Sequence, residues 1–387
     1  MLTLTVLDVL AAGKHMEKRT TIRDIAQALG VSIGTVDRAL NDRPGVNPMT
    51  KARVLQMART VGFKPNMAAR FLSSKRRLRV SVNIPCEIAS FWSLVHQGIQ
   101  EEAAPFSASG LEVEFRTFPR FGSGEEDVFE DALQAQVHGI IAAVGHPDQM
   151  RPLIRKASHS RIPVICVATD APGTERLAVV SIDPLVSGSL AGELLSRVIG
   201  GHGKLAVITG DLRISDHTEK HHAFRTAVRA LFPAFTVLDA IENHEDEAEA
   251  YEKCRHLLQI HPDIRGIYIS TANSEPVLRA LEDAGGLGKV TVLATDLSAA
   301  LVRRISRGDV VGSLYQRPRS QGRLAIRMLH SFLAEGQCPS YQVRLAPHVV
   351  MKSNLTFFLQ QLSLQHEPLE NNGNGEATHV ASDKPVT

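Results

Sequence analysis

Apolar residues recur at helical spacing near the start of the chain, where residues 22–29 and 33–40 each gather them on one face. Thr21, with an acid three residues later, has the form of a capping box, and Ser32 is a good N-cap for the second segment. The short connection around Gly30 has the length of the tight turn in a helix-turn-helix. The pattern therefore predicts two short helices in that arrangement, or alternatively a helical hairpin that only packs.

A third helix is predicted after these two. Asn47 and Pro48 suit its N-cap and first position, and Gly62 with Phe63 should stop it. Four apolar residues at helical spacing would close a small core: Val54, Met57, Ala58 and Val61.

From Leu78 onward the pattern changes to short apolar runs, most of them rich in Val and Ile, alternating with helical segments. This alternation indicates right-handed βαβ units and parallel sheets covered on both faces. Ten strands are too many for one comfortable sheet, so we expect two Rossmann-like lobes with a ligand cleft at the carboxyl ends of the strands. The predicted strands are 79–84, 111–118, 139–145, 163–170, 178–183, 204–210, 235–241, 266–272, 290–296 and 310–316.

Charge separates the two parts of the chain. The 387 residues carry a net charge of +2, yet residues 18–79 hold fourteen Lys and Arg against three Asp, which leaves −9 for the remainder. A basic head on an acidic body is the distribution expected of a protein that binds phosphates at one end.

Other features exclude several classes of protein. Cys86, Cys166, Cys254 and Cys338 are far apart, which favours reduced thiols over a disulfide framework or a metal site. The apolar start, residues 1–12, is shorter than a membrane span and lacks the basic region of a signal peptide. We expect residues 1–17 to form a disordered extension, with Met16 as the natural start.

The helix-turn-helix pattern predicts contact with DNA. In such a unit the exposed start of the second helix enters the major groove, which would direct a short set of side chains toward the bases. These are Ile33, Gly34, Thr35, Asp37 and Arg38.

The sequence of this region resembles the lactose-repressor family of bacterial transcription regulators. The matching run is Thr-Ile-x-Asp-Ile-Ala-x-x-x-Gly-Val-Ser-x-x-Thr-Val-x-Arg-x-Leu-Asn, followed after the third helix by Lys64-Pro65-Asn66. Asp37 stands where the family usually has Ser, and Ile33 and Gly34 stand where it often has a polar or aromatic pair. The resemblance adds further DNA contacts to the set above: Thr21, Ser32, Asn41, Asn66, Ala69 and Leu72.

The same resemblance implies a hinge helix in residues 64–77, after a helix-turn-helix domain at 18–63. In the family two such helices fold against each other in the minor groove, where Leu72 matches the residue that wedges between base pairs. The alternative is a plain basic linker through Lys75, Arg76 and Arg77.

The body, residues 78–360, is similar to the type I periplasmic sugar-binding proteins. Its signatures are Phe91-Trp92 after the first strand, Ile182-Asp183 with Gly188 and Ala191-Gly192 following, Asp296 after a strand and Gln316 before a helix. The resemblance implies three crossings between lobes, near Asp183, Gln316 and Tyr341. One lobe should then comprise about 78–182 and 317–340, and the other about 183–316 and 341–358, with a disordered tail at 361–387.

Polar residues just beyond strand ends are the candidate ligand contacts, because carboxylates and amides there can bind neighbouring hydroxyls. They are Asp170, Asn273, Asp296 and Gln316. By resemblance Phe91 and Trp92 would cover the apolar face of a sugar. The alternatives are that Trp92 fills the core and that Asp296 caps a helix before Ser298.

His217 and Lys220 belong to a polar cluster at residues 217–222, which we place at the cleft rim as ligand contacts rather than as a metal or general-base site. Phosphate-binding glycine motifs are absent, so no nucleotide cofactor is expected. The sequence thus predicts an all-α helix-turn-helix head followed by an α/β two-lobed effector domain. We expect a cytoplasmic, homodimeric repressor of a pseudo-palindromic operator, controlled by a sugar or polyol, with no catalytic, metal or cofactor site. The alternative is a solute-binding protein of sugar transport, or an enzyme on the same body.

Overall fold

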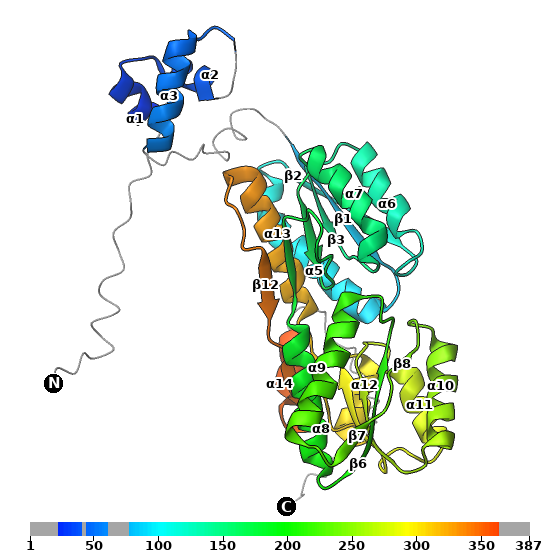
Figure 1. The fold of residues 1–387 in the computed structure, drawn as a ribbon. Helices are drawn as coiled ribbons and strands as arrows, with labels where there is room; N and C mark the ends of the chain where they lie inside the picture. The colour runs from blue at the N-terminus through cyan, green and yellow to red at the C-terminus, as the bar shows by residue number, and fades with distance from the viewer. Residues whose placement is uncertain (1–21, 41–43, 61–76, 364–387) are drawn as a thin grey trace, which may run out of the picture.

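The computed structural model describes residues 22–40, 44–60 and 77–363 (Figure 1). Its N-terminal part holds three helices, α1 (Ile22–Leu29), α2 (Ile33–Leu40) and α3 (Pro48–Thr60). The Ser32 hydroxyl accepts from the Thr35 backbone N–H at 3.1 Å and caps α2. The Asn47 side chain accepts from the Met49 N–H at 2.8 Å and caps α3. The helices bury a small core: Ile25, Ala26, Val36, Ala39, Val54 and Ala58.

The first lobe of the body is a parallel six-stranded sheet in the order β12-β5-β4-β3-β1-β2. Helices α5 and α13 contribute to the core on one face, and α6 and α7 to the core on the other. The strands are β1 (Leu78–Pro85), β2 (Leu111–Phe118), β3 (Gly139–Ala142), β4 (Val164–Val167), β5 (Ala178–Ile182) and β12 (Gln342–Leu345). The helices are α5 (Ala89–Ser107), α6 (Glu125–Gln134), α7 (Pro147–His159) and α13 (Pro318–Glu335).

The second lobe has the order β13-β11-β10-β9-β6-β7, with β8 also paired to β6. Helices α8 and α9 cover one face, and α10, α11, α12 and α14 contribute to the core on the other. The strands are β6 (Gly203–Thr209), β7 (Phe235–Val237), β8 (Ile241–Glu242), β9 (Ile264–Ile269), β10 (Thr291–Thr295), β11 (Gly312–Tyr315) and β13 (His348–Met351). The helices are α8 (Pro184–Ile199), α9 (Ser215–Leu231), α10 (Glu247–Ile260), α11 (Glu275–Asp283), α12 (Ala299–Arg307) and α14 (Lys352–Ser363).

This architecture confirms the predicted fold class, a helical head and an α/β body with two sheets. Two details differ from the sequence prediction. The run 235–241 is two short strands, because residues 238–240 leave the sheet between β7 and β8. The edge strands β12 and β13 are missing from the prediction, since their mixed sequences lack a long apolar run.

The chain passes between the sheets at Asp183, at Gln316–Arg317 and at Ala346–Pro347 (Figure 1). The expected third crossing near Tyr341 is misplaced, because β12 pairs with β5 and so belongs to the first lobe. The boundary between lobes therefore falls after Leu345. Among the described residues, no helix is long and apolar enough to cross a membrane.

Candidate functional site

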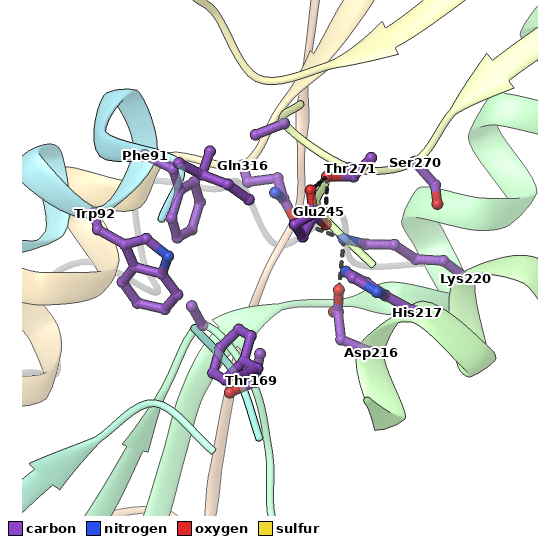
Figure 2. A pocket seen from close by; sticks show the side chains of 14 residues that line it. Phe91, Trp92, Thr169, Asp216, His217, Lys220, Glu245, Ser270, Thr271 and Gln316 are labelled. Atoms are coloured by element: carbon purple, nitrogen blue, oxygen red, sulfur yellow. Dashed lines mark hydrogen bonds and ion pairs between the residues drawn. The ribbon is translucent and has the colours of Figure 1, made fainter. Parts of the chain in front are cut away.

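A cleft opens between the two lobes, at the carboxyl ends of strands from both sheets (Figure 2). It contains about 470 Å³ of space not filled by atoms, its open mouth included. The first lobe contributes Ile88, Phe91, Trp92, Phe121, Ala168 and Thr169. The second lobe and the crossing contribute Asp216, His217, Lys220, Glu245, Ser270, Thr271, Ala272 and Gln316.

The first-lobe wall is aromatic. Phe91 and Trp92 lie in the first turn of α5, and Figure 2 shows them on the side of the cleft opposite Lys220. The Phe91 and Trp92 rings meet edge to face with centroids 5.0 Å apart, and Trp92 meets Phe121 in the same way at 5.9 Å. Because Phe91 and Trp92 are also buried in the lobe core, core packing fixes their positions. Such a wall suits the apolar face of a ligand.

The opposite wall is organised around Lys220, on α9. Its ammonium lies 2.6 Å from an Asp216 oxygen and donates at 2.6 Å to the side-chain oxygen of Gln316. Gln316 in turn donates through its side-chain and backbone nitrogens to Asp296, at 2.6 and 2.8 Å. Burial alone would lower the pKa of Lys220, but Asp216, Tyr268 and Asp296 together outweigh it and the pKa is raised. The network holds a charged lysine at the base of the cleft.

One oxygen of Asp216 has no partner. The residue lies in the first turn of α9 and is 7% exposed, and its second carboxylate oxygen makes no hydrogen bond to any described residue. An unpaired buried acceptor costs roughly 1–3 kcal/mol, which a donor that reaches this atom would relieve.

Glu245 supplies a second carboxylate to this wall. The Thr271 hydroxyl donates to it at 2.6 Å, and burial raises the pKa of Glu245 to about 7. The Asn273 side chain donates at 3.2 Å to the Glu245 carbonyl and so braces the loop. A Cβ on Gly210 would overlap both the Glu245 carboxylate and the His217 ring, so only glycine leaves room for them there.

The His217 ring is neutral in this arrangement. Burial lowers its pKa to about 4, and the Asp211 backbone N–H donates to its Nδ1 at 3.1 Å. The same Nδ1 lies 3.2 Å from the Asp211 carbonyl oxygen, so the Asp211 backbone fixes the orientation of the ring. Asp211 also faces the other lobe, where its carboxylate lies 3.4 Å from Nε2 of His146. This contact joins the lobes beside the cleft.

Backbone strain is concentrated around the cleft. Among the described residues, five non-glycine residues with positive φ line it or adjoin Gln316: Ile88, Ala168, Glu245, Asp296 and Arg317. Such conformations cost of order 1–3 kcal/mol each and cluster at functional sites. Their positions support the assignment of this cleft as the site.

Five of the eight predicted ligand contacts line the cleft: Phe91, Trp92, His217, Lys220 and Gln316. The other three do not, and each has an internal partner instead. Asp170 is 4% exposed and pairs with Arg176, at 2.9 Å, and with Arg344, at 3.2 Å. Asn273 braces the Glu245 loop and Asp296 holds Gln316. The structure therefore places these three outside the cleft lining, and direct contact of any of them with ligand stays a prediction.

The structure also decides between the alternative roles of Trp92 and Asp296, as a core residue and as a helix cap. Trp92 both packs in the core and lines the cleft. Asp296 does not cap α12, because the Ser298 hydroxyl does so, accepting from the Leu301 N–H at 3.1 Å.

Sequence reasoning missed Asp216 and Glu245. Asp216 adjoins the polar cluster at 217–222 and lies four residues before Lys220, a spacing that could have revealed their pairing on one helix face. Glu245 lies in a loop after a two-residue strand, with no pattern to distinguish it. Within the described parts of the chain, no group of three or more His, Cys, Asp or Glu could hold a metal ion, and all four cysteines are free.

The head presents the start of α2 to solvent. Ile33 is 49% exposed, Gly34 and Arg38 are exposed, and Thr35 and Asp37 are half-buried. Ser32 and Thr35 share a hydroxyl hydrogen bond of 2.8 Å at the cap. The other predicted DNA contacts lie outside the described residues: Thr21, Asn41, Asn66, Ala69 and Leu72.

Comparison with known proteins agrees with the division of the chain into a helical head and a two-lobed body. Residues 81–337 match the periplasmic binding protein domain, and residues 21–66 match bacterial regulatory proteins of the lacI family. Catabolite control protein A of Priestia megaterium is 27% identical over 209 residues, 54% of this chain and 60% of that protein. The HTH-type transcriptional regulator DegA of Bacillus subtilis is 29% identical over 212 residues, 54% of this chain and 61% of that protein.

The body also resembles solved structures. GanP, a glucose-galactose binding protein from Geobacillus stearothermophilus, superposes with a TM-score of 0.67 and 26% identity, over 72% of this chain and 99% of that one. The matched region spans about half to three fifths of the length of the curated relatives. The chain belongs to the family of periplasmic binding protein domains and carries, ahead of that domain, a helix-turn-helix head of the lacI family.

Proposed function

We propose that this protein is a DNA-binding transcription regulator, acting as a repressor, whose affinity for its operator is set by a small sugar or polyol bound in the cleft. The observation that carries the proposal is the pairing of two parts in one chain. A lacI-type head exposes the start of α2, and a two-lobed body places an aromatic wall opposite a wall of hydroxyl-binding groups.

The ligand class follows from the two walls. A sugar has an apolar C–H face and an edge of hydroxyls, which match Trp92 on one side and Asp216, Glu245 and Gln316 on the other. The 26% identical GanP is named as a glucose-galactose binding protein, which supports the same class. Binding at such a site requires no catalysis, cofactor or metal.

The mode of DNA binding follows from the head. One head reaches one half-site, so we propose a homodimer on a pseudo-palindromic operator in the cytoplasm. A ligand changes DNA affinity only if it favours one arrangement of the lobes. The His146–Asp211 contact between lobes is one interaction that closure would tighten or break.

The first test is calorimetry of the full chain against a panel of neutral sugars and polyols, followed by operator binding with and without each compound that binds. We expect at least one compound to bind and to change operator affinity. A compound that binds without any effect on DNA affinity would contradict allosteric control.

The second test is selection of binding sites from random DNA duplexes. We expect pseudo-palindromic sites and an affinity that falls steeply with salt, because residues 18–79 carry an excess of eleven positive charges. Asymmetric sites, or binding that is indifferent to salt, would contradict the proposed dimer. A solute-binding protein, the alternative from another class, would select no duplex at all.

A further inference from the structure

The charges that line the cleft do not balance. Among the described lining residues, Asp216 and Glu245 are acids, Lys220 is the single basic side chain that carries a charge, and His217 has its pKa lowered to about 4 by burial. A ligand in the cleft therefore meets more negative than positive charge when both acids are ionised.

The charge of Lys220 is already compensated. Its ammonium is paired to Asp216 at 2.6 Å and donates to Gln316 at 2.6 Å, and the whole residue is only 1% exposed. Moving it toward a ligand would leave the Asp216 carboxylate buried without its partner, which is strongly unfavourable.

Nearby arginines are engaged elsewhere. Arg176 and Arg344 pair with Asp170 behind the first-lobe wall, and Arg213 pairs with Asp211 at 2.6 Å. The amino end of α9 would attract an anion, but Asp216 in its first turn already supplies the negative charge. When Glu245 is ionised, a phosphate or carboxylate on a ligand would thus lie beside two acids, and the described lining residues offer it no uncompensated cation.

The same wall offers acceptors. One Asp216 oxygen is buried without a hydrogen-bond partner among the described residues, and the Glu245 carboxylate accepts from the Thr271 hydroxyl. Acceptors of this kind are satisfied by hydroxyl or amino donors. The aromatic wall across the cleft adds no charge.

We propose that the cleft selects uncharged, hydroxyl-rich ligands over their phosphate and carboxylate derivatives, and that Asp216 is the residue that determines this selection. The inference rests on the proposed effector function and narrows its ligand class. An amino group in place of a hydroxyl is accepted, because it donates and carries the complementary charge.

The test compares matched compounds on the full chain by calorimetry. The sets are glucose with glucose 6-phosphate and glucuronate, galactose with galactose 6-phosphate and galacturonate, and myo-inositol with its 1-phosphate. In the wild type we expect every neutral parent that binds to do so at least about tenfold more tightly than its anionic derivatives, the effect of one unfavourable charged contact.

The variant Asp216→Asn keeps the shape of the side chain and removes its charge. We expect neutral parents to bind roughly ten- to a hundredfold more weakly, and the discrimination against anions to narrow to within about threefold, because Lys220 then has no carboxylate partner. Asp263→Asn is the matched control. It removes the same charge from an exposed residue just before β9, paired with Lys204, and should leave discrimination unchanged.

The outcomes separate this inference from the function on which it rests. An anionic derivative that binds the wild type as tightly as its neutral parent overturns the inference but leaves an effector site in place. Full discrimination in a folded Asp216→Asn variant, checked by circular dichroism, overturns the role of Asp216. If no compound binds the wild type, the sugar effector itself is contradicted, and the inference with it.

Discussion

The two walls of the cleft are built by different physical means. Phe91 and Trp92 are held by the packing of the first-lobe core, in which the same rings fill space between α5, the sheet and Phe121. Lys220 and its partners are held by hydrogen bonds and ion pairs that link α9 to the crossing at Gln316 and the loop at Asp296. One wall is fixed by shape and the other by charge.

This difference predicts how substitutions in each wall affect stability. A packed aromatic side chain can be shortened at a cost that depends on the cavity left behind. A buried ion pair cannot lose one partner without leaving the other charge uncompensated. We therefore expect substitutions in the polar wall to produce larger and more selective effects than those in the aromatic wall.

The largest effect is expected for Lys220→Met, which leaves Asp216 buried without its cation. The free energy of unfolding should fall by about 3–5 kcal/mol, measured by denaturant titration. The control Lys204→Met removes a lysine from an exposed pair with Asp263 and should cost at most ~1 kcal/mol. Equal losses in the two variants would show that burial of the pair has no special cost.

In the aromatic wall, Trp92→Leu should lower stability by roughly 2–3 kcal/mol, less than a full truncation to Ala because Leu fills part of the cavity. Ligand affinity should fall as well, because the ring lines the cleft. Phe129→Leu makes a similar deletion in the core on the other face of the sheet. Affinity for a sugar that binds the wild type should be unchanged in that control; a matching loss would mean that Trp92 acts only through stability.

A smaller effect is expected for Asp296→Asn, which weakens the support of Gln316. One of the two hydrogen bonds from Gln316 loses its acceptor, so ligand affinity should fall several-fold while stability changes by about 1 kcal/mol. Ser298→Ala removes the cap of α12 in the same loop and should also cost ~1 kcal/mol. The ligand affinity of Ser298→Ala should stay at the wild-type value. This result would show that Asp296 acts by positioning Gln316, and that general loosening of the loop does not weaken ligand binding.

The smallest effect concerns pH. Burial raises the pKa of Glu245 to about 7 in the folded protein, above its usual value near 4.5, so the folded state holds more protons than the unfolded state between these values. Stability should therefore fall as pH rises from about 4.5 through 7.

Glu245→Gln should flatten that dependence, measured as the denaturant midpoint at pH 5, 6, 7 and 8. The exposed acid Glu247, changed to Gln, serves as the control and should leave the wild-type profile intact. An unchanged slope in Glu245→Gln would mean that this carboxylate does not titrate in that range.

Phe91, Trp92 and most of the fold could be predicted from the sequence, whereas Asp216 and Glu245 in the polar wall could not. Apolar periodicity indicates strands such as β1 and β10, because burial on both faces of a parallel sheet demands continuous apolar runs. Phe91 and Trp92 follow from their place after the first strand. Asp170 and Asp296 have the same sequence signal as a ligand contact, a carboxylate just beyond a strand end.

What decides their role is long-range pairing. Asp170 is occupied by Arg344, which lies 174 residues away in the chain, and Asp296 by Gln316. Local pattern carries no information about such partners. The same reason hides Glu245, whose position in the cleft depends on a loop held by Thr271 and Asn273.

The three crossings have a consequence for how such a protein can change in evolution. Neither lobe is encoded by one continuous stretch, since the first sheet takes α13 and β12 from beyond the second lobe. A gene fragment ending after Tyr315 would encode a first sheet without its edge strand and with one face covered by α5 alone. Recombination at a single junction can therefore exchange the head or the whole body, but not one lobe. New ligand preferences are expected to arise by substitutions within the cleft, or by replacement of residues 78–363 as a unit.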